Sequence, residues 1–305
     1  LGKEDGEIFC ACYAVHEQGN FHSPETCHAG QNILHVAEPF AVVAKRLGLL
    51  PHALEEKLVP MRQALLTRRA ERVAPGKDDK ILVAWNGMMI SALADGYRLT
   101  DNAAYREAAE TAARFILDTM LRDGVLCHSW RDGRAQIPAY LDDYAWFISS
   151  LLDLYEATFE SSWLDPAQQL PETMIEAFWN ETCAAFHSTS EKHDHLIARS
   201  VTTYDGAVPS GNAVAAALLL RQAILFNRQD YRAVAERIVK GSSTNIARSP
   251  RGFLGLLGVL ESCLGASRQI VVAGSPENPD FTALAKVLGR QYLADAVVAG
   301  YDPVA

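Results

Sequence analysis

Two kinds of helical segment alternate along the middle of the chain. The first kind is apolar at nearly every position, which predicts a helix buried on all sides, and the second is apolar on one face only. The three pairs are residues 85–99 with 103–121, 142–159 with 163–179, and 212–226 with 231–239. A short polar break separates the two members of each pair, so the pattern indicates a repeat of helical hairpins.

Repeated pairs of this kind are typical of an α/α toroid. The fully apolar helices would form an inner ring, and the amphipathic helices would cover it on the outside. The segments that precede the inner helices are long, at residues 122–141 and 180–211, whereas the turns that follow them are short. Because long loops on one face of a repeat array usually carry the function, we expect the functional site where the inner helices begin.

Further helix candidates precede the repeat, and a strand, a helix and a second strand follow it. In chain order they are residues 38–47, 52–73, 268–274, 279–292 and 296–299. The predicted fold is therefore mainly α. It consists of a partial α/α toroid over residues 1–266 and a small βαβ appendage over residues 267–305.

Net charge and the length of apolar runs exclude some classes of binding partner. The 305 residues carry a net charge of −9, which argues against nucleic acid, since phosphate binding needs clustered Lys and Arg. No apolar run reaches the roughly 18 residues that a membrane span needs. The first residue is Leu and no secretory segment follows it, so we expect a cytoplasmic chain that is part of a longer protein. No cofactor is predicted.

The cysteines carry little information about function. Six of them are too few for a disulfide scaffold. Cys10 and Cys12 form a C-x-C pattern with other possible metal ligands nearby, namely His16, His22, Cys27 and His28. The spacing matches none of the usual zinc patterns, so no metal site is predicted. The C-x-x-C of a redox helix is absent as well, so no dithiol–disulfide activity is expected.

Polar residues gather where each inner helix begins. Asp142 and Asp143 stand side by side at the start of the second inner helix, Asp79 precedes the first, and Asp205 precedes the third. Neighbouring residues on a helix point about 100° apart, so Asp142 and Asp143 cannot face the same way. We expect Asp143 to face a cavity as a general acid and Asp142 to cap the helix, with the reverse assignment left open.

Chemistry on a sugar needs a second group beside this acid. Hydrolysis of a glycoside uses two carboxyls across the substrate, and the second would come from Asp79 or Asp205. His128, in the long segment before the second inner helix, suits epimerisation, in which a base takes a proton beside a carbonyl. The structural alternative is that the Asp residues are helix caps and that His128 is bonded to the backbone.

Aromatic, amide and charged side chains near these positions are the candidate substrate-binding residues. Aromatic rings suit the C–H faces of sugars, Asn amides suit hydroxyls, and a guanidinium suits an anionic group. The set is Trp85, Asn86, Trp130, Arg131, Tyr144, Tyr204, Asp205 and Asn212. We expect one cavity at the start of the inner helices to bring together Asp79, Trp85, Asn86, His128, Arg131, Asp142, Asp143, Tyr144, Asp205 and Asn212. Hairpin packing, helix capping and solvated turns are the structural alternatives.

Several motifs occur in the order of a known family. They are Asp79-Lys80-Ile81-Leu82 with Trp85-Asn86-Gly87, Ser129-Trp130-Arg131-Asp132-Gly133, Leu141-Asp142-Asp143-Tyr144, and Tyr204-Asp205-Gly206 with Pro209-Ser210-Gly211-Asn212. In this ordered set the chain resembles the C-terminal part of the uncharacterised thioredoxin-domain-containing (spermatogenesis-associated, thioredoxin-like) family. The resemblance implies a six-hairpin, glycosidase-like α/α domain, similar to N-acylglucosamine 2-epimerases. It also implies a thioredoxin-like domain and first hairpins that this chain lacks, so the ring is expected to be incomplete, either open or completed by a partner copy.

The leading hypothesis is a carbohydrate-active domain, either a sugar isomerase or epimerase or a glycoside hydrolase, whose ligand is a small carbohydrate. The rival is a non-catalytic scaffold that binds a ligand or another protein, and a third is a regulatory domain that depends on the absent thioredoxin-like part. The fold alone does not decide between them. A buried Asp142 or Asp143 in a pocket beside Trp85 and Tyr144 would favour the enzyme, and a filled ring centre would favour the scaffold.

Overall fold

A computed structural model describes residues 1–21, 30–193, 197–291, 293 and 296–302. The chain forms two compact units, residues 1–78 (unit 1) and residues 79–305 (unit 2). Unit 1 contains the helices α1 (Lys3–Cys12), α2 (Phe40–Leu47) and α3 (Pro51–Ala70), which share a small core around Phe9, Val43 and Leu58. The helices predicted at residues 38–47 and 52–73 are therefore confirmed, as α2 and α3.

The described part of unit 2 contains inner helices that lie side by side in chain order: α4 (Val83–Thr100), α6 (Leu141–Thr158), α8 (Gly211–Leu225) and α10 (Leu254–Leu264). An outer helix packs on each of the first three: α5 (Ala103–Thr119), α7 (Leu164–Phe178) and α9 (Gln229–Arg248). α6 and α8 bury most of their residues, as their apolar sequences predict. The predicted division into inner and outer helices is confirmed. The inner helix α10 was not predicted.

The first two inner helices approach each other closely at a glycine. A Cβ built on Gly87 of α4 would lie 2.8 Å from the carbonyl carbon of Trp146 in α6, a distance that real Cβ atoms do not show. Because glycine has no side chain, the two backbones can meet here. Gly87 therefore fixes how α4 and α6 pack, and with it the relative positions of their N-termini.

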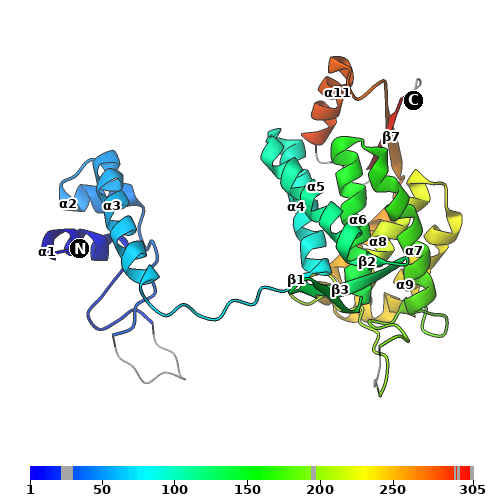
Figure 1. The fold of residues 1–305 in the computed structure, drawn as a ribbon, viewed down its shortest axis with the longest axis horizontal. Coiled ribbons are helices and arrows are strands. Elements are labelled where there is room, and N and C mark those ends of the chain that lie inside the picture. The colour runs from blue at the N-terminus through cyan, green and yellow to red at the C-terminus, as the bar shows by residue number, and fades with distance from the viewer. Residues whose placement is uncertain (22–29, 194–196, 292, 294–295, 303–305) are drawn as a thin grey trace. The chain divides into compact units, whose positions relative to one another are not determined.

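The long segment at residues 122–141 was predicted to be a loop, and that prediction was wrong. It contains most of a small antiparallel sheet in which β3 (Val125–Arg131) pairs with β1 (Ile81–Leu82), β2 (Leu121–Arg122) and β4 (Arg134–Pro138). Asp132 and Gly133 connect β3 to β4 with φ values of 51° and 77°. A two-residue hairpin turn requires this left-handed backbone, which Asp-Gly adopts readily. The sheet lies where α4 and α6 begin (Figure 1).

Shorter elements complete the hairpins. A two-stranded sheet of β5 (Trp179–Asn180) and β6 (Ala185–Phe186) follows α7, and the 3₁₀ turns η1 (Ser161–Trp163) and η2 (Pro250–Gly252) precede α7 and α10.

The C-terminal appendage has the predicted βαβ order. β7 (Arg268–Ala273) pairs in parallel with β8 (Ala296–Tyr301), and α11 (Pro279–Gly289) connects them. β8 packs on α6, where the Gly300 N–H donates a hydrogen bond of 3.1 Å to the Tyr155 hydroxyl. The appendage is therefore part of compact unit 2, at the end opposite the β1–β3 sheet (Figure 1). The predicted domain division between residues 266 and 267 stays a prediction. The division between the two compact units of the structure falls between Asp78 and Asp79.

Candidate functional site

Three carboxylates hold the N-termini of the inner helices together. The Asp143 carboxylate of α6 accepts the backbone N–H of Ala84 in α4 at 3.0 Å. Asp142 of α6 accepts the backbone N–H of Gly211, the first residue of α8. Asp205 accepts the N–H groups of Ser210, which caps α8, at 2.9 Å and of Gly255, in the first turn of α10, at 2.8 Å. Free N–H groups at a helix N-terminus favour such anionic partners, so the inner helices all begin at one end of unit 2.

Asp143 is the most constrained of these carboxylates. Its side chain is 1% exposed, and besides Ala84 it accepts the backbone N–H of Tyr140 at 2.9 Å and contacts Nδ1 of His128 at 2.8 Å. With Tyr140 it forms a capping box on α6. The capping of α6 that was expected of Asp142 therefore falls to Asp143, as the alternative assignment allowed. Which of the two carboxylates acts on a substrate stays a prediction.

Asp142 is the carboxylate that reaches solvent. Its pKa is raised, first because neighbouring atoms partly desolvate it and then because the Asp143 charge lies close, while the Gly211 N–H opposes the rise. A Cβ at Gly211 would meet the Asp142 carboxylate, so a side chain at this position would displace that carboxylate from the Gly211 N–H. Asp142 therefore has the properties of a group that holds a proton more readily than an ordinary aspartate.

His128 lies on β3 beside these carboxylates. A carboxylate can only accept, so the 2.8 Å contact with Asp143 places a hydrogen on Nδ1 and leaves Nε2 as the basic nitrogen of the neutral ring. The pKa of His128 is raised, chiefly by this hydrogen bond; partial burial and the Lys80 ammonium act in the other direction. The side chain is 25% exposed, so the ring is held by Asp143 and yet reachable from solvent.

Two further rings extend the surface around His128. The Tyr140 ring stands edge-on to the His128 ring, with centroids 4.8 Å apart, and stacks on the ring of His193 at 4.7 Å. His193 donates from Nε2 to the Pro138 carbonyl at 2.9 Å, and its Nδ1 accepts the Ser190 N–H at 3.2 Å. Both ring nitrogens of His193 are thus engaged, and no sequence pattern predicted this contact with Tyr140.

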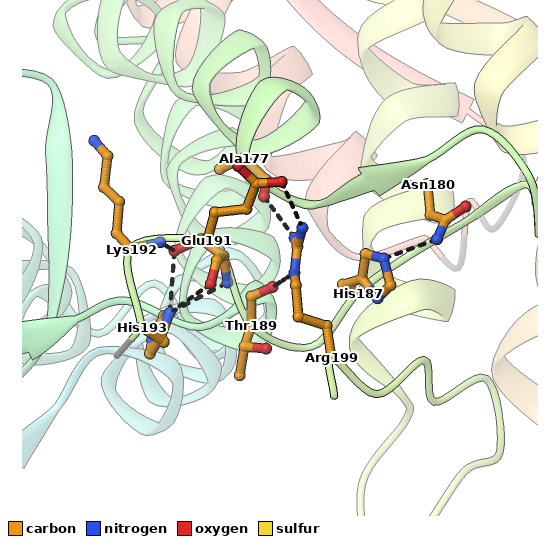
Figure 2. Close-up of polar contacts among 9 residues, drawn as sticks. Ala177, Asn180, His187, Thr189, Glu191, Lys192, His193 and Arg199 are labelled. Atoms are coloured by element: carbon orange, nitrogen blue, oxygen red, sulfur yellow. Dashed lines mark hydrogen bonds and ion pairs between the residues drawn. The ribbon is translucent and has the colours of Figure 1, made fainter. Parts of the chain in front are cut away.

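The loop that carries His193 is fixed to the outer helix. Figure 2 shows Arg199 reaching back to donate from Nε to the Thr189 carbonyl at 2.8 Å and from Nη2 to the Ala177 carbonyl at 2.9 Å. Nearby, the Asn180 amide donates to Nε2 of His187 at 2.8 Å (Figure 2). Arg199 thus ties the backbone at Thr189 to α7, and the contacts with Pro138 and Ser190 hold the His193 ring beside Tyr140.

Several predicted binding residues have partners within the fold. Tyr144 is 2% exposed, and its hydroxyl accepts the Leu126 N–H at 3.1 Å. Asn212 is fully buried and bonds to both Phe186 and Thr202. Trp130 packs edge-on to Phe115, and Asn86 lines an outer groove beside α5 while donating to Leu82. The structure does not place these four residues around one cavity with His128.

The remaining candidates lie on the surface of unit 2. Asp79 and Arg131 form an ion pair at 2.9 Å between two half-exposed side chains at the β1–β3 sheet. Trp85 is 68% exposed in the first turn of α4, next to the residue whose N–H contacts Asp143. Tyr204 is 58% exposed and lies edge-on to Phe253 before α10. Among the predicted residues, the structure joins His128 to Asp143, with Asp142 next to Asp143 on α6, and joins Asp79 to Arg131.

The Cys and His residues near Cys10 were weighed as possible metal ligands, and no metal site was predicted from them. Among the residues described, no group of three or more His, Cys, Asp or Glu side chains is placed to hold a metal ion. His22, Cys27 and His28 lie outside those residues. Of the helices in the described ranges, none is long and apolar enough to cross a membrane.

The architecture and the cross-linked helix starts define unit 2 as an α/α toroid domain. A solved structure with this fold is the GH76 α-mannanase BT2949 of Bacteroides thetaiotaomicron, with a TM-score of 0.51 at 15% identity. The match covers 72% of this chain and 58% of the mannanase. At this identity the likeness shows a shared fold, which confirms the predicted fold class.

The sequence relatives are more specific. The chain is 30% identical over 311 residues to spermatogenesis-associated protein 20 of Mus musculus and 29% identical over 311 residues to the Homo sapiens protein of that name. Each match covers 96% of this chain and 39% of the relative, so the chain spans about two fifths of the length of these relatives. The predicted resemblance is confirmed. No protein-family model matches the chain.

Proposed function

We propose that unit 2 is a carbohydrate-active domain that moves a proton beside the carbonyl group of an open-chain sugar, as a sugar isomerase or epimerase does. The observation that carries this proposal is the 2.8 Å contact between His128 Nδ1 and Asp143. It orients a basic Nε2 at a partly open position, and orientation by a carboxylate is a common way to prepare a histidine for general base catalysis.

The proposed proton transfers use two groups. His128 Nε2 takes the proton from the carbon beside the carbonyl, and Asp142, protonated more readily than usual, donates a proton to the carbonyl oxygen. In isomerisation, His128 returns the proton to the neighbouring carbon while Asp142, now a carboxylate, takes the hydroxyl proton from the first carbon, where the new carbonyl forms. In epimerisation, the enediol turns over in the site, His128 returns the proton to the other face of the same carbon, and Asp142 takes back the proton that it gave to the carbonyl oxygen. The Tyr140 ring beside His128 offers a flat surface for the sugar.

The same contacts disfavour glycoside hydrolysis by the adjacent carboxylates. Hydrolysis needs two available carboxyl groups across the substrate. Asp143 is 1% exposed and already holds Ala84, Tyr140 and His128, which leaves it no room to act on a sugar. Asp142 alone supplies one of the two groups, and Asp79 is held in its ion pair with Arg131.

Proton exchange in heavy water tests the proposal. We expect the full chain to replace the hydrogen beside the carbonyl of at least one aldose in a panel by deuterium, seen as loss of its proton NMR signal. His128→Gln should slow this exchange by about 10²-fold or more, since it removes the base. His52→Gln, an exposed histidine in unit 1, is the matched control and should exchange at the wild-type rate.

Two outcomes would redirect the proposal. Release of reducing sugar from a disaccharide or mannan panel, lost in Asp142→Asn and kept in His128→Gln, would replace isomerisation by hydrolysis. Failure of every sugar to exchange, to be hydrolysed or to bind would favour a non-catalytic scaffold. The buried bonds of Asn212 and Tyr144 support that second candidate, because those predicted binding residues serve the fold.

The wider setting is also proposed. We propose that the rest of the full-length protein contains the thioredoxin-like domain implied by the resemblance, and that self-association completes the toroid. We also propose that the protein works in the cytoplasm, where proteins usually have few cysteines and no disulfide framework, as in this chain with its six cysteines. Size measurement of the chain in solution and microscopy of a tagged full-length protein test the last two points.

A further inference from the structure

Tyr204 carries an exposed aromatic ring in a segment whose backbone is fixed on both sides of it. Before it in the chain, the Thr203 carbonyl accepts the Ser210 hydroxyl at 3.2 Å. After it, the Asp205 N–H donates to the Gly252 carbonyl at 2.8 Å. The Tyr204 residue nevertheless remains 58% exposed. The fold therefore holds the backbone around Tyr204 and leaves its side chain open to solvent.

A glycine makes room for the Tyr204 ring. A Cβ built on Gly252 would collide with Cε2 of the ring, so any side chain at residue 252 would displace it. The φ of Gly252 is not in the left-handed region, so the backbone conformation does not itself require glycine there. The Phe253 ring also contacts Tyr204, edge-on with centroids 5.6 Å apart. Gly252 and Phe253 thus hold an exposed aromatic ring in one position.

A ring held in this way suits the binding of a sugar. The C–H groups on one side of a sugar ring pack well on the apolar face of an aromatic ring. Tyrosine has only two side-chain torsions, so it loses little conformational entropy when a ligand covers it, and a ring that the fold already holds loses less still. Tyr204 therefore offers a preorganised stacking surface.

This surface lies at the same end of the inner helices as His128, but beside different helices. Asp205, which follows Tyr204, accepts the N–H of Gly255 in the first turn of α10. His128 lies instead at the start of α6, where it contacts Asp143. α8 packs between α6 and α10. The axes of packed helices are about 8–10 Å apart, so two helix spacings, roughly 16–20 Å, separate the two positions, and a single sugar ring cannot reach both.

We propose that Tyr204 is a second sugar-binding position and that the substrate is an oligosaccharide. The open-chain sugar at its reducing end reacts at His128, and a unit further along the chain stacks on the Tyr204 ring. For the reacting sugar this inference rests on the proposed function, and the stacking at Tyr204 is what it adds. A monosaccharide is then the weaker ligand, because it occupies only one of the two positions.

Saturation-transfer NMR titration of the full chain with cello-, malto- and manno-oligosaccharides of increasing length, each series including its monosaccharide, tests this position. In at least one series we expect the longer members to bind about five- to tenfold more tightly than the monosaccharide, the gain that one aromatic stacking contact gives. Tyr204→Ala should remove this gain and leave the affinity for the monosaccharide unchanged, whereas Tyr204→Phe should keep the gain. Tyr301→Ala is the matched control, since Tyr301 is 59% exposed at the other end of unit 2, and it should keep the gain as well.

Gly252→Ala is the sharper variant, because it leaves the tyrosine in the chain and displaces only its ring. We expect it to lose the dependence on chain length as Tyr204→Ala does, while its circular dichroism matches the wild type.

Other results would overturn the proposal. These are equal affinity for all lengths in every series, no binding of any sugar, a gain that survives in Tyr204→Ala, or a gain that is lost equally in Tyr301→Ala. Failure of the reaction is seen separately. A length dependence that needs Tyr204, without deuterium exchange, would remove the reaction at His128 and leave the second sugar position. Exchange on a monosaccharide that needs His128, without any length dependence, would remove the second position and leave the reaction.

Discussion

The two ends of the inner helices use charged residues in different ways. At the N-terminal end, each of Asp142, Asp143 and Asp205 accepts a backbone N–H group from a neighbouring helix. These hydrogen bonds link the N-termini of the inner helices. At the C-terminal end, the acidic side chains of α6 are instead paired with the guanidinium group of Arg221. The aspartates at the helix N-termini therefore stabilise the packing of the inner helices. The proposed reactive group is a side chain that they position, His128.

The strongest test of this contrast replaces the two adjacent aspartates separately. Asp143→Ala should cost about 3–5 kcal/mol of unfolding free energy, because it leaves buried N–H groups of Ala84 and Tyr140 and the His128 ring without their acceptor. Asp142→Ala, at an exposed position, should cost about 1 kcal/mol or less. Urea denaturation measures both, and equal losses would show that Asp143 is not the structural member of the pair.

Asn212 offers the same test at the next helix. Asn212→Ala should cost about 2–4 kcal/mol, because three hydrogen bonds to Phe186 and Thr202 disappear inside the core. Asn86→Ala is the control, as that amide bonds only to Leu82 within its own turn and should lose about 1 kcal/mol or less. A cost for Asn212→Ala as small as for Asn86→Ala would return Asn212 to the list of binding candidates.

Substitutions at Gly87 of α4 and Gly258 of α10 should change stability in opposite directions. Gly87→Ala should destabilise unit 2 by about 1–3 kcal/mol, since the new methyl group meets the Trp146 backbone. Gly258→Ala should instead stabilise it by about 0.5–1 kcal/mol, because its methyl group enters open space and alanine favours the helix. Thermal unfolding decides the signs, and destabilisation by Gly258→Ala would mean that the open space at Gly258 is absent in solution.

The smallest expected effect is a pH dependence. The pKa of His128 is raised in the folded chain, so protonated His128 adds stability that is complete below the unfolded pKa of about 6.5 and is lost as the pH rises through the folded value. His128→Gln should flatten the fall in stability above about pH 6.5. An unchanged slope in the variant would mean that the His128–Asp143 contact does not form in solution.

The hairpin repeat could be predicted because fully apolar and amphipathic segments alternate over long stretches. The β3–β4 hairpin was missed although Asp132-Gly133 is a hairpin turn signal, because the flanking residues were assigned to a loop. α10 was missed because it stands outside the recognised pairs. Asp143 caps α6 through the Tyr140 N–H, at the three-residue spacing of a capping box. The Ala84 N–H that Asp143 also accepts lies 59 residues away, and no local pattern contains that contact.

The charged network at the C-terminal end did leave a signal in the sequence. Asp95 with Arg98, and Asp153 with Glu156, are charges three residues apart within helices that are otherwise apolar. On a buried helix such residues must meet partners or line a cavity, since unpaired buried charge is costly. The sequence does not show that Arg221 of a third helix closes the network, because that pairing depends on how the helices pack.

A crystal structure of the chain soaked with a mixture of monosaccharides tests the central claim most directly. We predict a sugar at the N-terminal end of the inner helices, stacked on Tyr140, with a hydrogen-bearing carbon about 3–3.5 Å from Nε2 of His128 and an oxygen within hydrogen-bond reach of Asp142. Sugar bound elsewhere on unit 2, with the surface between His128 and Asp142 occupied by water at saturating concentrations, would contradict the assignment of this end as the reaction site.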